Sequence, residues 1–325
     1  MLKTDHTDDG FHPYPYLSMT RRQLLFSPLL LSAQEPIKVQ VNLVNVPFSA
    51  RDEHGRWVSD LRAQDLEVFE DGIPQKISFF SAAQDSALSV AVIADISGSQ
   101  EEFLKEHRRD LRDFLKTVMT KRDQATLICF GNSIRIASPF HQDADHLDDA
   151  LKDYQKSKNA SQLPRLGPRE IRSGGTAFYD AIVHTAGQFD GQEGRRVILL
   201  FSDGEENSSA HNLLDAIESA QAIGATIFSL RYTEIHKGVW TARNKYGRSV
   251  MNRLATETGG LDFDASSGDL KGAFRQITEM LRSTYDLAYT SNLPAQDAGF
   301  RKIRIRSKRP NLAFRHKTGY YARPL

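Results

Sequence analysis

One stretch of the sequence decides the fold, Leu88-Ser89-Val90-Ala91-Val92-Ile93-Ala94-Asp95-Ile96-Ser97-Gly98-Ser99. Residues 88–94 are almost continuously apolar, which is typical of a parallel strand that is covered on both faces. A charged amphipathic helix is expected directly after the stretch, over about residues 101–119. The stretch therefore predicts an α/β domain whose first strand ends in a carboxylate and two hydroxyls.

Strands and helices alternate from this stretch to residue 284. We expect strands at residues 125–130, 197–201, 226–230 and 261–265, and a short hairpin around residues 134–140. Helices are expected at residues 144–155, 176–189, 212–223, 252–258 and 270–284. This alternation predicts a doubly wound, Rossmann-like α/β sheet, which binds ligands beyond the carboxyl ends of its strands. The single cysteine, Cys129, lies in an apolar strand and is expected to be a core residue.

The segments on either side of the α/β region have β character. We expect strands at residues 37–48, 66–70, 75–80, 285–290, 302–306 and 314–321, with a bulge near Leu43–Val44 and a hairpin at Asp71–Gly72. No helices are available to cover these strands, so we expect both groups to pack together into one small β-sandwich. The basic run at residues 301–309 alternates with Ile303 and Ile305, which favours a charged edge strand over a nucleic-acid surface.

The first 33 residues are predicted to be a targeting segment. Arg21 and Arg22 precede a short apolar stretch that ends near Ala33, which is the order of a secretory signal. The pair of arginines is also similar to a twin-arginine export signal, and Met19 is a candidate start codon. The apolar stretch is shorter than the roughly 20 residues of a membrane span. We therefore expect a periplasmic or secreted protein; a basic, apolar segment of a disordered tail is the alternative.

The bulk composition restricts how the protein recognises a partner. The chain has 325 residues, of which 40% are hydrophobic and 26% charged, as is usual for a soluble globular protein. Its formal net charge is +1, from 42 basic and 41 acidic residues, so no global field attracts nucleic acid or an anionic membrane. Recognition must therefore depend on a local site.

Three separated segments place oxygen ligands at expected strand ends or helix starts. Asp95, Ser97 and Ser99 follow the first strand, Thr176 follows Gly174-Gly175 at a helix start, and Asp203 follows the strand at residues 197–201. Carboxylate and hydroxyl oxygens are hard ligands that suit Mg²⁺, Ca²⁺ or Mn²⁺ better than zinc. In the alternative interpretation the hydroxyls cap helices and the aspartates accept backbone amides.

At these residues the sequence resembles the von Willebrand factor type A (VWA) family. The family's metal-ion-dependent adhesion site (MIDAS) uses a D-x-S-x-S motif, a distal threonine and a distal aspartate in this order. The resemblance covers roughly residues 88–284 and implies a VWA domain over 87–284, between sandwich parts at 34–86 and 285–325. It implies that the metal, Mg²⁺ or else Ca²⁺ or Mn²⁺, is held by Asp95, Ser97, Ser99, Thr176 and Asp203. It also implies that a partner's Glu or Asp completes the coordination.

The flanking strands add to the resemblance. Residues 65–72 and Gly319-Tyr320-Tyr321 are similar to segments of exported bacterial VWFA-related proteins, which also place a VWA domain between two β segments. The loops near the motif offer further candidates. We expect Glu205 and Glu206 to form a solvated rim and Arg172 to be an exposed loop residue. The insertion 236–249 is expected to set partner choice or to form a mobile loop.

The expected function is a metal-dependent protein-binding module that is not an enzyme. No histidine stands in the motif or beside Asp203 to act as a general base, and no phosphate-binding glycine loop occurs. We expect neither nucleic-acid binding nor a membrane span. Two alternatives remain open, a VWA subunit that regulates an enzyme or assembly and a structural domain without metal. Export and cleavage near Ala33 separate the first alternative from the expected function.

Overall fold

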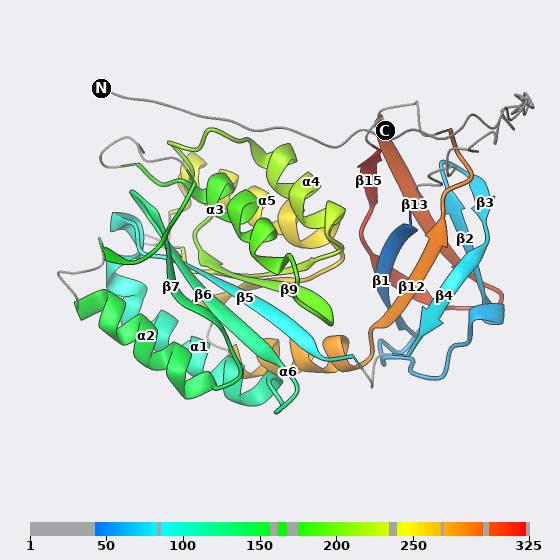
Figure 1. Cartoon of the computed structure of the whole chain (residues 1–325), viewed down its shortest axis with the longest axis horizontal. Coiled ribbons are helices and arrows are strands. Elements are labelled where there is room, and N and C mark those ends of the chain that lie inside the picture. The colour runs from blue at the N-terminus through cyan, green and yellow to red at the C-terminus, as the bar shows by residue number, and fades with distance from the viewer. Residues whose placement is uncertain are drawn as a thin grey trace, which may run out of the picture. The chain divides into compact units, whose positions relative to one another are not determined.

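The computed structural model describes residues 43–82, 86–156, 162–167, 175–233, 239–267, 270–294 and 299–322. Its central sheet contains seven strands: β5 (Leu88–Asp95), β6 (Gln124–Phe130), β7 (Ile134–His141), β8 (Arg165–Leu166), β9 (Arg195–Ser202), β10 (Thr226–Arg231) and β11 (Asp262–Asp264). Their order is β11-β10-β9-β5-β6-β7-β8. Figure 1 shows β7, β6, β5 and β9 side by side. β11, β10, β9, β5 and β6 are parallel, whereas β7 and β8 are antiparallel to their neighbours.

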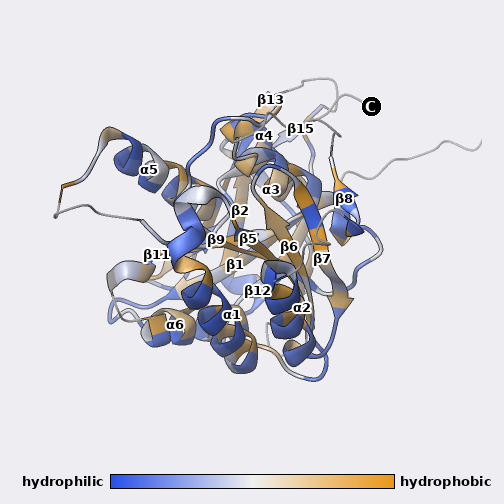
Figure 2. Cartoon of the chain, turned by 90° about the vertical axis from the view of Figure 1, so that its left-hand side faces the viewer, coloured by the Kyte–Doolittle hydropathy of each residue, from blue (hydrophilic) through white to orange (hydrophobic). Residues whose placement is uncertain are grey.

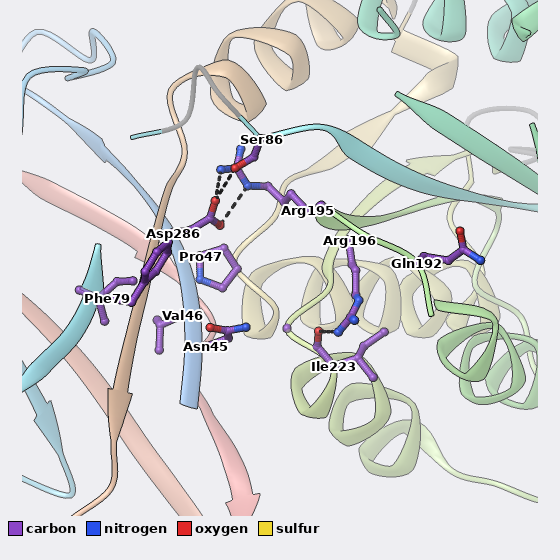
Figure 3. Close-up of a pocket in the computed structure, with 13 residues that line it drawn as sticks. Asn45, Val46, Pro47, Phe79, Ser86, Gln192, Arg195, Arg196, Ile223 and Asp286 are labelled. Atoms are coloured by element: carbon purple, nitrogen blue, oxygen red, sulfur yellow. Dashed lines mark hydrogen bonds and ion pairs between the residues drawn. The ribbon is translucent and has the colours of Figure 1, made fainter. Parts of the chain in front are cut away.

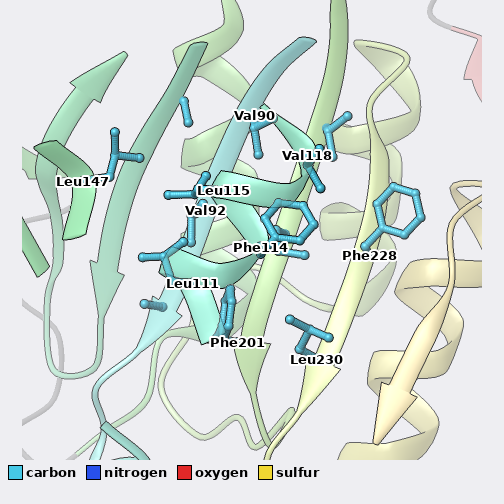
Figure 4. Packing of buried hydrophobic residues seen from close by; sticks show 14 of the residues in the cluster. Val90, Val92, Leu111, Phe114, Leu115, Val118, Leu147, Phe201, Phe228 and Leu230 are labelled. Atoms are coloured by element: carbon cyan, nitrogen blue, oxygen red, sulfur yellow. The ribbon is translucent and has the colours of Figure 1, made fainter. Parts of the chain in front are cut away.

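Helices cover both faces of this sheet. They are α1 (Leu104–Val118), α2 (Ala144–Lys156), α3 (Phe178–Ala186), α4 (Leu213–Ala222), α5 (Ala242–Glu257) and α6 (Leu270–Arg282). Buried side chains of α1, α2 and α6 form one core with the sheet, including Leu111 and Phe114 against Val92 (Figure 4). Those of α3, α4 and α5 form a second core on the other face. Figure 2 shows the hydrophobic strands of the sheet among helices whose outer sides are hydrophilic. The predicted doubly wound α/β fold is therefore confirmed.

Helix α5 differs most from the sequence-based expectation. It begins at Ala242, whereas the sequence predicted a helix only from residue 252 and an insertion before it. Thr241 caps its first turn by accepting a hydrogen bond from the Asn244 amide at 3.1 Å. The buried position in the early turns is Gly247, so no apolar side chain marks the helical period there.

The flanking segments form two four-stranded sheets. The strands are β1 (Leu43–Arg51), β2 (Leu66–Glu70), β3 (Ile73–Gln75), β4 (Ile77–Ser81), β12 (Tyr285–Thr290), β13 (Gly299–Ser307), β14 (Ala313–His316) and β15 (Gly319–Ala322). One sheet has the order β14-β1-β12-β4 and the other β15-β13-β2-β3. A single core joins them, with Val46 and Leu287 from one sheet and Val68 and Ile303 from the other. The predicted small sandwich, built from both ends of the chain, is confirmed.

Two of the predicted sandwich strands are each divided between the two sheets. The return strand expected at residues 75–80 breaks at Lys76, because β3 pairs with β2 while β4 pairs with β12. The strand expected at residues 314–321 breaks in the same way, because β14 pairs with β1 and β15 with β13. β4, β14 and β15 each place a side chain against the sandwich core, and Gln75 at the end of β3 is also buried. A change of pairing partner therefore leaves little trace in the apolar pattern.

The start of β1 and the basic strand β13 show further differences. Leu43 is 56% exposed and Val44 is buried, so the core side of β1 begins at Val44. Residues 37–42, which precede the expected bulge, lie outside the described residues. In β13, Ile303 and Ile305 are buried as predicted, but the strand lies between β15 and β2 and is not an edge strand. Arg301 in β13 is also buried.

Two further expectations concern the buried cysteine and membrane spans. Cys129 is fully buried in β6, as predicted, and burial raises the pKa of its thiol. None of the helices in the described part of the chain has the length and hydrophobicity needed to cross a bilayer.

A cavity of about 330 Å³ lies between β1 and the start of β9 (Figure 3). Arg195 lies in its wall, donating to the Asp286 carboxylate at 2.7 Å and to the carbonyl oxygens of Leu281 and Thr284. Ser86 donates to the same carboxylate at 3.0 Å. The guanidinium of Arg195 is thus directed to protein acceptors. The cavity lies at the start of β9, whereas Asp203 follows its end.

Lys317, between β14 and β15, is buried against the end of α4. Its ammonium donates to the carbonyl oxygen of Gln221 at 2.9 Å and lies 5.7 Å from the Tyr320 ring, with His316 next to it in the chain. Burial lowers the pKa of Lys317 from 10.5 to about 8. The folded chain therefore holds a lysine that loses its proton more readily than it does in the unfolded chain.

Substituting Lys317 by methionine is expected to change how stability depends on pH. Between the folded pKa near 8 and the unfolded pKa near 10.5, the unfolded chain binds more protons, so wild-type stability rises with pH. We expect wild type to gain about 2 kcal/mol relative to Lys317→Met between pH 7.5 and pH 10. Urea unfolding of both proteins at each pH measures the gain. The exposed Lys302→Met is the matched control, and an equal pH profile for all three proteins would contradict the prediction.

Candidate functional site

Asp95 stands at the carboxyl end of β5 and is fully buried. Its Oδ1 accepts a hydrogen bond from the Ser97 amide at 2.9 Å, and its Oδ2 accepts one from the Ser202 hydroxyl at 2.6 Å. Ser202 is the last residue of the neighbouring strand β9. These two contacts fix the orientation of the carboxylate at the edge of the sheet where the sequence predicted a site.

The hydroxyl oxygens of Ser97 and Ser99 lie 3.2 Å apart in the loop after β5. Ser97 precedes the 3-10 turn Gly98–Phe103, but its side chain makes no capping hydrogen bond there. Helix α3 likewise has Ala177 at its N-cap position and no side-chain cap. The interpretation of these hydroxyls as helix caps is therefore wrong for Ser97 and for Thr176. The other part of that alternative is met, since Asp95 and Asp203 each accept one backbone amide.

Asp203 follows β9 and is 6% exposed. Its Oδ1 accepts a hydrogen bond from the Glu205 amide at 2.9 Å, and its Oδ2 accepts one from the Gln100 side chain, also at 2.9 Å. Gln100 is fully buried and also donates to the Tyr232 carbonyl oxygen at 3.1 Å. Gln100 therefore joins the serine loop to the Asp203 loop. The sequence analysis missed it, since nothing but its place next to Ser99 marks it.

Thr176 is fixed to the Asp203 loop through backbone contacts. Its amide donates to the Asn207 side chain at 2.6 Å, and the Asn207 amide donates to the Thr176 carbonyl oxygen at 3.3 Å. Glu206 accepts hydrogen bonds from the amides of Phe178 and Tyr179 at the start of α3. The start of α3 and the loop after β9 are thus held together. Within the described ranges, no hydrogen bond joins the Thr176 side chain to the other four predicted ligands.

Several predictions about the loops need correction or lie outside the structure. Glu205 and Glu206 do not form a solvated rim. Glu205 is 8% exposed and pairs with Arg243 at 2.6 Å, while Glu206 holds the α3 amides and the Ser209 hydroxyl. The insertion 236–249 is helical from Ala242, and its first residues, like Arg172 and Gly174, lie outside the described residues.

The electrostatics of the site favour a cation. Burial and the nearby Asp203 carboxylate together raise the pKa of Asp95 to about 7. Burial and Asp203 also raise the pKa of Glu205. In the part of the chain that the structure describes, no Lys, Arg or His forms an ion pair with Asp95 or Asp203. Two buried carboxylates without a counter-charge, together with adjacent hydroxyls, are the donor set expected of a hard divalent cation.

His107 on α1 is a buried histidine. Its ring lies 4.3 Å from the ring of Tyr232 and 5.7 Å from that of Phe201. Burial lowers its pKa to about 3, so the ring is neutral around pH 7. No group of three or more His, Cys, Asp or Glu side chains with metal-binding geometry occurs within the residues described. The candidate site thus depends on hydroxyl oxygens as well as carboxylates.

Helix α5 rests directly on the Asp203 loop through two glycines. Gly204 has a φ of +78°, and a Cβ atom there would lie 2.6 Å from the Gly247 carbonyl oxygen. A Cβ atom at Gly247 would in turn overlap the carbonyl oxygen of Asp203. The two backbones therefore approach each other more closely than side chains would allow.

Comparisons with known proteins give only structural similarities. No family model and no curated protein matches the chain. It is similar to an aerotolerance-related membrane protein from Bacteroides fragilis NCTC 9343, with 20% identity, a TM-score of 0.45, and coverage of 60% of this chain and 98% of that chain. It is also similar to the conserved hypothetical protein BatB from Bacteroides thetaiotaomicron, with 20% identity, a TM-score of 0.45, and coverage of 61% and 100%.

A third similarity is to proximal thread matrix protein 1 from the mussel byssus, in a structure described as having a zinc-occupied MIDAS motif. The identity is 17%, the TM-score is 0.42, and the match covers 61% of this chain and 48% of that chain. All three TM-scores are below 0.5 and all three identities are 20% or lower, so these similarities assign no function to the chain.

Proposed function

We propose that the chain is a VWA-type module that binds a protein partner through a divalent cation. One observation carries the proposal: Asp95 and Asp203 are buried at the ends of the neighbouring strands β5 and β9, and among the described residues no Lys, Arg or His pairs with either carboxylate. Ser97 and Ser99 add two hydroxyl oxygens 3.2 Å apart. The Thr176 amide donates to the Asn207 side chain, which connects Thr176 to the Asp203 loop.

The residues that would hold the cation are Asp95, Ser97, Ser99, Thr176 and Asp203. All five offer hard oxygens, which fits Mg²⁺ and also Ca²⁺ or Mn²⁺. When bound, the cation supplies a positive centre that accepts a further oxygen ligand. The residues of this chain fix the carboxylate orientations, as the Ser202 hydroxyl does for Asp95 and Gln100 does for Asp203. A Glu or Asp side chain of the partner would then complete the coordination.

The proposed role is binding and not catalysis. The hydroxyls of Ser97 and Ser99 would be ligands, and His107, the buried histidine of α1, has a pKa near 3 that does not suit a general base near pH 7. Nucleic acid is not expected as a partner, because the exposed Lys302, Arg304 and Arg306 are explained as the solvent face of β13.

We further propose that the protein acts outside the cytoplasm, either in the periplasm or secreted. The support is the Arg21-Arg22 pair followed by the apolar stretch up to Ala33. Mass spectrometry of the protein recovered from each cell fraction tests it. Cleavage near Ala33 in an exported fraction is expected, and recovery of only unprocessed cytoplasmic chain would contradict export.

Metal binding is expected to stabilise the full chain against heat. At a cation concentration about ten times the Kd, the stabilisation is about 1.4 kcal/mol, which raises Tm by about 3–6 °C for a domain of this size. Thermal unfolding in EDTA and in Mg²⁺, Ca²⁺ or Mn²⁺ measures the rise. Asp95→Ala removes a ligand and is expected to abolish it.

Asp149→Ala is the matched control for that substitution. Asp149 is an exposed carboxylate on α2, so its loss should leave the rise in Tm unchanged. If no cation raises the Tm of wild type, or if Asp95→Ala shows the same rise, the metal site is refuted.

A further inference from the structure

The first half of α5 presents a basic surface beside the candidate site. Arg243 and Tyr246 are exposed, lie three residues apart on one side of the helix, and are called the α5 surface. Lys245 and Arg248 are also exposed and add positive charge on other sides of the helix. The helix contains no acidic residue before Glu257. Tyr246 is 56% exposed, so an aromatic ring lies among the positive charges. The surface therefore matches an acidic segment that also offers some apolar contact.

The α5 surface has a fixed position. The backbone contact between Gly247 and the Asp203 loop leaves no room for a side chain, and Val250 and Met251 are buried in the core. The Tyr246 hydroxyl lies 3.3 Å from the hydroxyl of Tyr179 on α3. A ligand that contacts this surface is thus held at a constant distance from Asp203, which reduces the entropic cost of binding.

Arg243 links the α5 surface to the candidate metal site. One of its guanidinium nitrogens lies 2.6 Å from the Glu205 carboxylate, while 62% of its side chain is exposed. An arginine has five N–H donors, so this guanidinium has donors directed to solvent as well as to Glu205. The Glu205 amide donates to the Asp203 carboxylate, so Glu205 connects Arg243 to a proposed metal ligand.

Resting on the proposed function, we propose that the α5 surface binds an acidic segment of the protein partner. One carboxylate of the segment would complete the coordination of the cation that Asp95 and Asp203 hold. Arg243 then receives a second carboxylate of the same segment through charge-assisted hydrogen bonds. An acidic protein segment is favoured over a nucleic-acid backbone, because the proposed function already brings a carboxylate of the partner to the cation.

Binding of a fluorescein-labelled octaglutamate peptide tests the proposal. Fluorescence anisotropy is measured with the full-length chain in excess Mg²⁺, for wild type, Arg243→Gln and Arg253→Gln. Arg253 is the matched control, since it lies on the same helix and pairs with Glu257 away from Asp203. We expect Arg243→Gln to weaken peptide binding about tenfold, the loss expected for a hydrogen bond between charged groups. Arg253→Gln should bind like wild type.

The rise in Tm with Mg²⁺ is measured for each variant as an independent readout. If Arg243→Gln keeps both the rise in Tm and wild-type peptide affinity, the α5 surface is refuted while the metal site stands. The α5 surface is also refuted, and the metal site stands, if wild type shows the rise in Tm with Mg²⁺ but does not bind the peptide. Labelled duplex DNA that binds as tightly as the peptide, with or without EDTA, would also overturn the proposal. If no variant shows a rise in Tm, the metal site itself fails.

Discussion

Replacing Glu70 by alanine is expected to destabilise the protein by about 3–5 kcal/mol, the usual cost of leaving one member of a buried ion pair alone. Glu70 is fully buried in the sandwich core. Its Oε1 accepts hydrogen bonds from Arg301 at 2.9 Å, Ser291 at 2.8 Å and Tyr320 at 3.2 Å. The Arg301 side chain is only 6% exposed, so its charge would remain in the core without a carboxylate. Urea unfolding measures the loss.

Two further variants make this result specific. Glu67 lies on the same strand and is exposed, so Glu67→Ala should change stability by less than about 0.5 kcal/mol. The double variant Glu70→Leu with Arg301→Met removes both charges, and it should recover much of the stability lost in Glu70→Ala. If Glu70→Ala is no more destabilising than Glu67→Ala, the buried pair between β2 and β13 does not stabilise the sandwich.

The sequence predicted those parts of the fold whose apolar pattern fits only one kind of secondary structure and one pairing. β5 and β9 are buried along almost their whole length, so their apolar runs were recognisable and placed Asp95 and Asp203 at the strand ends. The break between β3 and β4 at Lys76 was not predicted, because both strands border the same core. The start of α5 was missed because its buried face begins with Gly247, which leaves no hydrophobic signal.

The candidate site was predictable only in part for a similar reason. Asp95, Ser97, Ser99 and Asp203 were found because a short motif and two strand ends mark them. The groups that position them come from elsewhere in the chain and carry no local pattern. Gln100 holds Asp203, and Asn207 and Glu206 hold the segment of Thr176 and α3. Glu206 was misassigned to a solvated rim, since a carboxylate that caps a distant helix looks in sequence like any surface acid.

Replacing Gly247 by alanine is expected to reverse the usual effect of this substitution. In an ordinary helix interior, alanine is more stable than glycine by about 1 kcal/mol. Here the added Cβ would overlap the Asp203 carbonyl oxygen, and its other near neighbours, in Asp203 and Gly204, are also backbone atoms. Either α5 or the Asp203 loop must then move, and we expect a destabilisation of about 1–3 kcal/mol, as for an overpacked core.

The same substitution also separates the role of Gly247 in the site from its role in folding. Because the displaced loop carries Asp203, Gly247→Ala should reduce the rise in Tm with Mg²⁺ as well as the Tm in EDTA. Ser249→Ala is the control, since Ser249 is exposed on the same helix and alanine there should be neutral or slightly stabilising. A Gly247→Ala protein that is more stable than wild type and retains the full rise in Tm would show that α5 is free to shift. The fixed placement of Arg243 beside the candidate site would then be lost as well.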